Sequence, residues 1–317
     1  MTKEELLQEL STRVSAGEIN REEVIRQFNP TPITGKLSHF SVTKMLYVLG
    51  AAIVVIGLII FVAQIWDDLG SFGHILITLG LGLLFAIIGS VLLKQRPEES
   101  LGSIFHALGG LLIPGGAMVT LDELNVGLDS LWSVAITFGL IFIFYWLLNL
   151  AHKRPILTFF TIANGTAFVY LLVEAIIDGP FYQHEDLYAY LTMIMGVSYL
   201  LLAQSFRYGW NRGLVHVLYF LGGAGFFGAA FSRVDNSVPW QLVYFLIVFG
   251  GLFLSVYLKS RIILLLSTIF LIAHISYITS EYFADSLGWP IMLVILGFIF
   301  IGLGYVSITI NRKYIKN

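Results

Sequence analysis

The sequence contains no cysteine and little charge. Asp, Glu, Lys and Arg together make up 12% of its 317 residues, and Cys is absent. Without cysteine the chain has no disulfide, thiolate zinc site, iron–sulfur cluster or cysteine nucleophile. Soluble domains carry about a quarter charged residues, so this chain has too little polar surface to cover a water-facing globule. A formal net charge of −2 also argues against nucleic-acid binding through a basic surface.

Hydrophobic residues are abundant instead, at 57% of the chain, and they gather in long runs. A bilayer core of about 30 Å is crossed by about 20 apolar residues in a helix. The runs therefore predict an all-α, polytopic integral membrane helix bundle with about ten transmembrane helices. The ten stretches are Met45–Ile65, Phe72–Leu93, Leu101–Leu121, Leu131–Leu150, Ile156–Ile177, Leu187–Phe206, Leu214–Phe231, Trp240–Leu258, Ile262–Phe283 and Trp289–Ile310.

The third stretch differs from the others because it contains Gly109-Gly110 and then Pro114-Gly115-Gly116. Proline inside a helix removes a backbone hydrogen bond and clashes with the preceding turn. We therefore expect this helix to be kinked or interrupted near Pro114.

Basic residues alternate with acidic ones in the connections between these stretches. If the N-terminus lies in the cytoplasm, 17 of the 18 Lys and Arg residues fall on the cytoplasmic side, and only Arg233 lies outside. The opposite connections are acidic. This asymmetry follows the positive-inside rule and predicts that both termini are cytoplasmic.

The same alternation suggests a repeated unit in which an apolar stretch, an acidic connection and a second apolar stretch follow a basic residue. The units begin near Lys44, Ser100, Pro155, Arg212 and Arg261. We interpret them as five helical hairpins in series, either a true duplication or simply the period of any chain that alternates across a membrane.

A short polar segment precedes the membrane region. Lys3–Val14 has leucines at amphipathic spacing, and Asn20 followed by Glu23 resembles a capping box that opens a second helix ending near Phe28. We predict a cytoplasmic helical N-terminal segment over residues 1–40 and a ten-span transmembrane domain over residues 41–317.

Several of these residues form a family pattern. The N-terminal helix pair contains Gly17-Glu18-Ile19 and Glu22-Glu23. The first span contains the run Leu49–Gly57, and it ends in the tryptophan–acidic turn Ala63–Leu69. The segment up to Leu93 resembles the bacterial predicted membrane proteins of domain of unknown function 2157. The resemblance implies a location in the bacterial inner membrane. No catalytic residue is defined for that family, so none is carried over.

Ionisable residues inside the predicted spans are few, although such residues are the usual functional candidates in membrane proteins. Glu174 and Glu281 lie near predicted outer ends, where they are expected to reach the interface. His106, His216 and His274 are expected to be buried and hydrogen-bonded to a neighbouring helix. Asn164, in mid-span, serves either as an interhelical hydrogen-bonding residue or as a ligand contact.

Glycine is concentrated in the seventh stretch, at Gly223-Ala224-Gly225-Phe226-Phe227-Gly228. The letters match a dinucleotide-binding fingerprint, but that motif needs a preceding strand. Small residues allow close helix packing, and irregular backbone in a membrane can line a cavity. We therefore expect a ligand or packing site between the helix at Pro114 and the helix at Gly225. The candidate residues are Pro114, Gly115, Gly116, Asn164, Gly223, Gly225, Gly228 and His274.

The sequence favours two functions, with a membrane enzyme as a less favoured third. One is binding or translocation of a hydrophobic, lipid-like small molecule. The other is a non-catalytic membrane scaffold or accessory subunit that recruits a protein partner through the N-terminal helix pair. The sequence has no Ser/His/Asp pattern at recognisable spacing and no phosphate-binding loop, so it favours a protein that is not an enzyme. We predict no cofactor, no metal site and no nucleic-acid partner; the lipid bilayer is the expected environment.

Overall fold

The computed structural model describes residues 42–96, 100–126, 130–177 and 183–283, and shorter pieces at 8–9, 11–13, 294, 297–298, 301–302, 305–306 and 308–315. Within these ranges every regular element is helical, as predicted. The chain divides into two compact units, Met1–Ile56 and Gly57–Asn317. Most of the predicted N-terminal helix pair lies outside the described residues, but Gln8, Glu9 and residues 11–13 are helical, and Arg13 donates to Glu9.

Helix α3 (Val42–Ile65) covers the first predicted span, and the 3₁₀ turn η1 (Trp66–Asp68) follows it. The second span is continuous over Ser71–Gln95 and is made of three pieces. These pieces are α4 (Ser71–Ile75), the π-helical segment η2 (Leu76–Gly80) and α5 (Leu81–Gln95).

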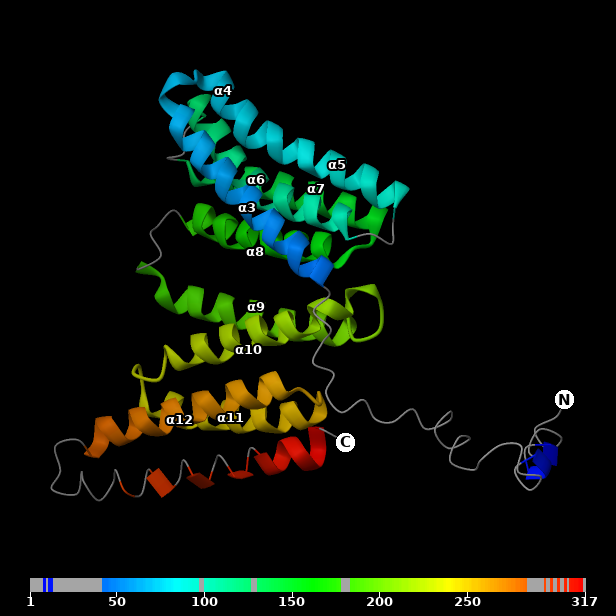
Figure 1. The fold of residues 1–317 in the computed structure, drawn as a ribbon. Coiled ribbons are helices and arrows are strands. Elements are labelled where there is room, and N and C mark those ends of the chain that lie inside the picture. The colour runs from blue at the N-terminus through cyan, green and yellow to red at the C-terminus, as the bar shows by residue number, and fades with distance from the viewer. Residues whose placement is uncertain are drawn as a thin grey trace. The chain divides into compact units, whose positions relative to one another are not determined.

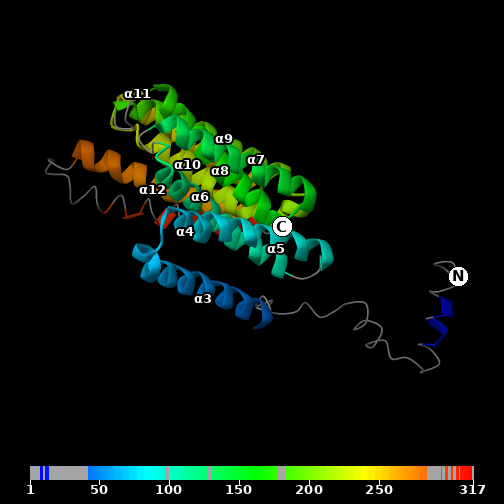
Figure 2. The same cartoon turned by 90° about the horizontal axis from the view of Figure 1, so that it is seen from above.

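The remaining spans are single long helices, one of them extended by a 3₁₀ turn. They are α6 (Leu101–Glu123), α7 (Leu131–His152), α8 (Pro155–Ile177), α9 (Glu185–Ser205), η4 (Trp210–Leu214) with α10 (Val215–Phe231), α11 (Val238–Tyr257) and α12 (Arg261–Phe283). A short π-helical segment, η5 (Asn311–Ile315), lies near the C-terminus. The long helices of the second unit have roughly aligned axes in both views (Figures 1 and 2).

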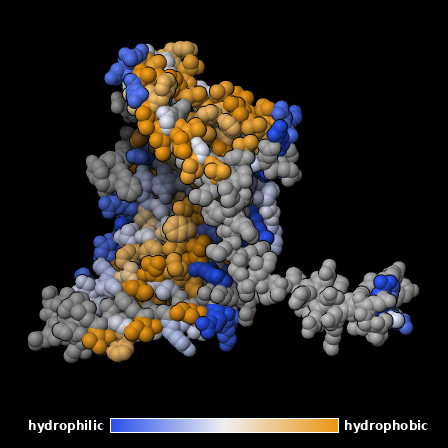
Figure 3. All heavy atoms as spheres, in the orientation of Figure 1, coloured by the Kyte–Doolittle hydropathy of each residue, from blue (hydrophilic) through white to orange (hydrophobic). Residues whose placement is uncertain are grey.

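Eight helices in the described part of the chain are long and apolar enough to cross a membrane. They coincide with the second to ninth predicted spans. Helix α3 is not among the eight, and the tenth predicted span, Trp289–Ile310, lies largely outside the described residues. The class of fold is confirmed, whereas the count of ten is not. Figure 3 shows hydrophobic surface along the uppermost helices, with hydrophilic residues at both ends, as expected for a span between two interfaces.

Of the kink or interruption expected at Pro114, the interruption was wrong. Helix α6 runs without a break from Leu101 to Glu123 and contains Pro114 in its interior. Proline costs about 3 kcal/mol in an isolated helix, but neighbouring helices hold a transmembrane helix in place around it. Here Ile113 and Gly116, on either side of Pro114 and Gly115, are both buried against neighbours.

The expected grouping into hairpins also requires correction. The helices that pack most extensively are α5 with α6, α7 with α8, α9 with α10, and α11 with α12, as Figure 1 shows for the last two pairs. Each pair is joined by a connection on the predicted cytoplasmic side, and not by one of the predicted outer connections. Two of these connections are very short: Lys153-Arg154 joins α7 to α8, and Leu258–Ser260 joins α11 to α12.

Glycine explains two of these close pairs. At the α5–α6 contact, a Cβ added to Gly109 would lie 2.9 Å from the carbonyl oxygen of Gly82. At the α9–α10 contact, a Cβ on Gly196 would lie 2.7 Å from the carbonyl oxygen of Gly222. Backbones that approach this closely pack through van der Waals contact, which drives helix association where lipid replaces water.

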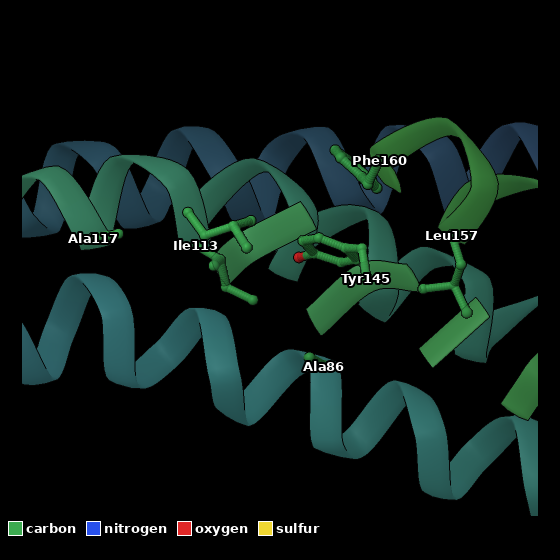
Figure 4. Close-up of a cluster of buried hydrophobic side chains, with 7 residues drawn as sticks. Ala86, Ile113, Ala117, Tyr145, Leu157 and Phe160 are labelled. Atoms are coloured by element: carbon green, nitrogen blue, oxygen red, sulfur yellow. The ribbon is translucent and has the colours of Figure 1, made fainter. Parts of the chain in front are cut away.

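The α5–α8 region shares one buried cluster, drawn in Figure 4. Tyr145 of α7 and Leu157 of α8 are completely buried in it, and Ala86 of α5 and Ile113 of α6 lie beside them. Two further clusters hold α9 to α12 together. The close packing therefore continues through all eight spans of the described structure.

Candidate functional site

An apolar groove of about 520 Å³ lies among α9, α10 and α11. Its lining side chains come from three successive helices and the start of a fourth. They are Val197, Leu200, Leu201 and Gln204 of α9, Phe226 and Phe227 of α10, Leu246, Ile247, Gly250, Gly251, Leu254 and Tyr257 of α11, Leu258, and Ile263 of α12. A volume of this size is within the range of about 300–1,000 Å³ typical of small-molecule sites.

The polar lining of the groove is confined to one end. Gln204 lies in the last turn of α9 and Tyr257 is the last residue of α11, so both are next to basic connections. The Gln204 side-chain oxygen accepts hydrogen bonds from Tyr219 Oη and Arg207 Nη1, each at 3.2 Å. The groove is therefore apolar along its length and polar only toward the basic side of the bundle.

A second cavity, of about 300 Å³, lies at the same basic end. It is lined by Arg207, Tyr208, Arg212, Val215 and His216. No carboxylate is among these residues. We call it the basic pocket; it adjoins the groove through the hydrogen bond from Arg207 to Gln204.

The opposite, acidic end carries a different arrangement, formed by Trp66, His74 and Glu123. The rings of Trp66 and His74 stack at a centroid distance of 3.9 Å. His74 Nε2 lies 2.8 Å from the Trp66 carbonyl oxygen, and His74 Nδ1 contacts the Glu123 carboxylate. The Glu123 side chain is also hydrogen-bonded to Ser71. The cluster fastens η1 and α4 to the end of α6.

The chemistry of this cluster follows from the partners of the imidazole. A carbonyl oxygen and an ionised carboxylate are both acceptors, so each ring nitrogen of His74 must carry a hydrogen unless Glu123 itself is protonated. In either arrangement the pair holds one proton more than a neutral histidine beside a carboxylate. The cluster therefore holds one extra proton at the acidic end of two spans.

Arg233 is the basic residue predicted on the acidic side, and it forms an ion pair with Asp186. Asp186 lies in the first turn of α9 and Arg233 follows the end of α10, so the pair closes the α9–α10 contact at that end. The Asp186 carboxylate thus neutralises Arg233, the one basic residue that departs from the positive-inside pattern.

The three histidines predicted in spans have different surroundings. His274 is fully buried; its Nε2 lies 3.1 Å from the Gln241 carbonyl oxygen, which confirms the predicted bond to a neighbouring helix. His106 is also fully buried, with Nε2 3.4 Å from Ser90 Oγ. His216 is exposed and lines the basic pocket, so its predicted burial was wrong.

The first group of predicted site residues lies on α6. Pro114 is half-buried, Gly115 has open space around it, and Gly116 rests on the backbone of Thr78 and Leu79 in η2. Helix α6 packs against α5, α7 and α8. These three residues therefore belong to helix packing in that part of the bundle.

The second group lies on α10, which packs against α9, α11 and α12. A Cβ on Gly223 would meet Leu266 of α12 at 2.8 Å, one on Gly228 would lie 3.7 Å from Phe270 of α12, and one on Gly225 would lie 3.8 Å from Thr192 of α9. The helix contacts thus place the Pro114 and Gly225 groups in different parts of the bundle, and they give no support to a shared site.

Asn164 has a more local role than predicted. It is buried in α8, and its Nδ2 donates to the carbonyl oxygen of Phe160 in the same helix at 2.8 Å. The predicted interhelical hydrogen bond is not the one that the structure shows. Satisfying the amide within its own helix removes the cost of burying it.

The groove, the basic pocket and the His74–Glu123 pair were not predicted as sites. His74 and Glu123 lie 49 positions apart in the sequence, each near the end of a different span. The one available signal was the tryptophan–acidic turn at Trp66, which lies directly beside them. Within the described residues no three metal-ligating side chains gather.

Eight apolar helices, closed by polar clusters at their two ends, define a polytopic membrane protein with several membrane-spanning helices. Residues 4–152 match the family model described as predicted membrane protein (DUF2157), which confirms the resemblance over that part of the chain. The matched region ends with α7 and includes Trp66, His74 and Glu123. No curated protein and no solved structure matches the chain.

Proposed function

We propose that this membrane protein binds a lipid-like amphiphile, with its hydrocarbon chain in the groove between α9 and α11. The observation that carries the proposal is the shape and chemistry of the groove: about 520 Å³, apolar along its length, and polar at the end where Gln204 and Tyr257 lie. We place the protein in the bacterial inner membrane with both termini in the cytoplasm, which puts the polar end of the groove at the cytoplasmic interface.

An amphiphile fits this groove better than a purely apolar molecule does. Lipid tails are as apolar as leucine, so moving a chain from the bilayer into the groove yields little free energy by itself. Selective binding must therefore come from the polar end. Gln204 is held there by Tyr219 and Arg207, so its position is set before a ligand arrives.

The experiment uses Gly250, which lines the groove and has open space where a Cβ would lie. Gly250→Phe should fill the groove without pressing on a neighbouring helix. Gly115→Phe is the matched control, because Gly115 also has open space and lies on α6, away from the groove.

Native mass spectrometry of the full chain, with added phosphatidylglycerol, measures occupancy. We expect one tightly held lipid on the original protein and on Gly115→Phe, and loss of that lipid from Gly250→Phe. Equal retention by both variants would overturn the proposal.

The alternative function, a scaffold that recruits a partner, rests on residues 1–40, most of which lie outside the described residues. It stays a prediction.

A further inference from the structure

We infer that the basic pocket at the cytoplasmic end of the groove selects an anionic, phosphate-type headgroup, held by Arg207 and Arg212. This inference rests on the proposed function, since it assigns the headgroup of the molecule whose chain lies in the groove. It concerns a different set of residues and therefore can fail separately.

The first support is charge. The basic pocket has two arginines and one histidine among its five lining residues and no acidic side chain. Within the described residues, neither Arg207 nor Arg212 forms an ion pair with a carboxylate, whereas Arg233 at the other end of α10 is paired with Asp186. Guanidinium groups bind phosphate oxygens through two parallel hydrogen bonds, so they suit a phosphate better than a neutral headgroup.

The second support is continuity with the groove. Arg207 Nη1 donates to the Gln204 side-chain oxygen at 3.2 Å, and Gln204 itself lines the groove. A single amphiphile can therefore place its chain along α9 and α11 and its headgroup beside Arg207. Basic residues on the cytoplasmic side are general in membrane proteins; a basic cavity that opens next to an apolar groove is the additional feature here.

The third support is the rigidity of the segment that carries Arg212. Its neighbour Asn211 is buried, and the Asn211 side-chain oxygen accepts a hydrogen bond of 2.8 Å from Thr158 of α8. The turn before η4 is made at Gly209, whose φ of 140° is a conformation that L side chains rarely adopt. The chain therefore turns at Gly209 and is anchored at Asn211, which holds Arg212 at the edge of the cavity.

The test compares two lipids with identical chains, phosphatidylglycerol and phosphatidylcholine, for binding to the full chain in detergent micelles. The variant is the double change Arg207→Gln and Arg212→Gln. The control is the double change Lys94→Gln and Lys153→Gln, which removes two positive charges at the end of α5 and directly after α7. Thermal unfolding of each protein verifies that it is folded.

We expect the original protein and the control to prefer phosphatidylglycerol by about tenfold, the size expected when one charge-assisted hydrogen bond of about 1.5 kcal/mol is gained. The arginine variant should lose that preference and bind the two lipids equally. If the arginine variant keeps the preference, or if the control loses it equally, the inference is wrong.

Inorganic phosphate, added as a competitor, distinguishes the source of the anion. Displacement of phosphatidylglycerol only by other anionic lipids supports a lipid headgroup. Binding of phosphate itself with the same dependence on both arginines, without any lipid preference, would overturn the lipid assignment. If neither lipid binds the original protein, the proposed function fails, a result distinct from equal binding of the two lipids.

Discussion

A single methyl group added at Gly116 perturbs the closest backbone contact of α6. Gly116 faces the π-helical segment η2, where an added Cβ would lie 2.4 Å from Leu79 N and 2.7 Å from the Thr78 carbonyl carbon. These are backbone atoms, so no side-chain rotation relieves the overlap. A Cβ added to its neighbour Gly115 would instead meet nothing within 4 Å. The two adjacent glycines form a matched pair.

The expected magnitude follows from these distances. Ordinary van der Waals contact begins at 3.4 Å, so Gly116→Ala requires α6 and η2 to separate by about 1 Å. Overpacking of this kind typically costs about 1–3 kcal/mol. The preference of alanine over glycine in a helix, about 1 kcal/mol, applies to both positions and cancels in the comparison. We therefore expect Gly116→Ala to unfold more easily than Gly115→Ala by about 1–3 kcal/mol.

The assay is reversible unfolding of the full chain in mixed micelles, followed by circular dichroism, for the original protein and both variants. Gly115→Ala should be as stable as the original or slightly more so. If the two alanine variants differ by less than about 0.5 kcal/mol, the range typical of surface substitutions without a close contact, then the α6–η2 contact does not contribute as the structure indicates.

Two further perturbations test the polar contacts in the same assay. Glu123→Ala removes the partner of His74 and should lower the midpoint of unfolding. Asp122→Ala, at an exposed neighbouring position, should leave the midpoint unchanged. Equal effects of the two changes would argue against the His74–Glu123 contact. Thr158→Val removes the donor to Asn211 and should cost about 1–3 kcal/mol, the typical cost of leaving a buried polar group unsatisfied. Thr137→Val, whose hydroxyl bonds only to its own helix, should have almost no effect, and a loss as large as that of Thr158→Val would contradict this reasoning.

Features that depend on one segment alone were predictable from the sequence. A run of apolar residues long enough to cross a bilayer must satisfy its backbone hydrogen bonds internally, so it forms a helix whatever its neighbours are. The second to ninth spans were therefore predicted within a few residues of their observed ends. The basic and acidic connections were also predictable, because moving a charged side chain into the hydrocarbon core has a large cost in free energy.

The continuity of α6 at Pro114 and the pairing of the helices were not predictable in this way. Local chemistry predicts a break at Pro114, but α5, α7 and α8 pack around α6 and keep it continuous. Two of the observed pairs, α5 with α6 and α9 with α10, depend on which glycines meet, such as Gly109 with Gly82, and periodic charge does not reveal these contacts. The groove between α9 and α11 is likewise lined by residues of several helices, among them Leu200, Phe226 and Leu246, and no single segment reveals it.

By itself, the sequence determined that this is an all-helical membrane protein, because hydrophobicity and helix length are properties of each segment alone. The family resemblance near the N-terminus was also readable, from a short pattern around Trp66. Only the tertiary structure decided which helices pair, that His74 meets Glu123, and that an apolar groove ends beside two arginines. Those features depend on contacts between residues far apart in the chain. Inside a membrane such contacts are selected by close packing, which the hydropathy of a sequence does not report.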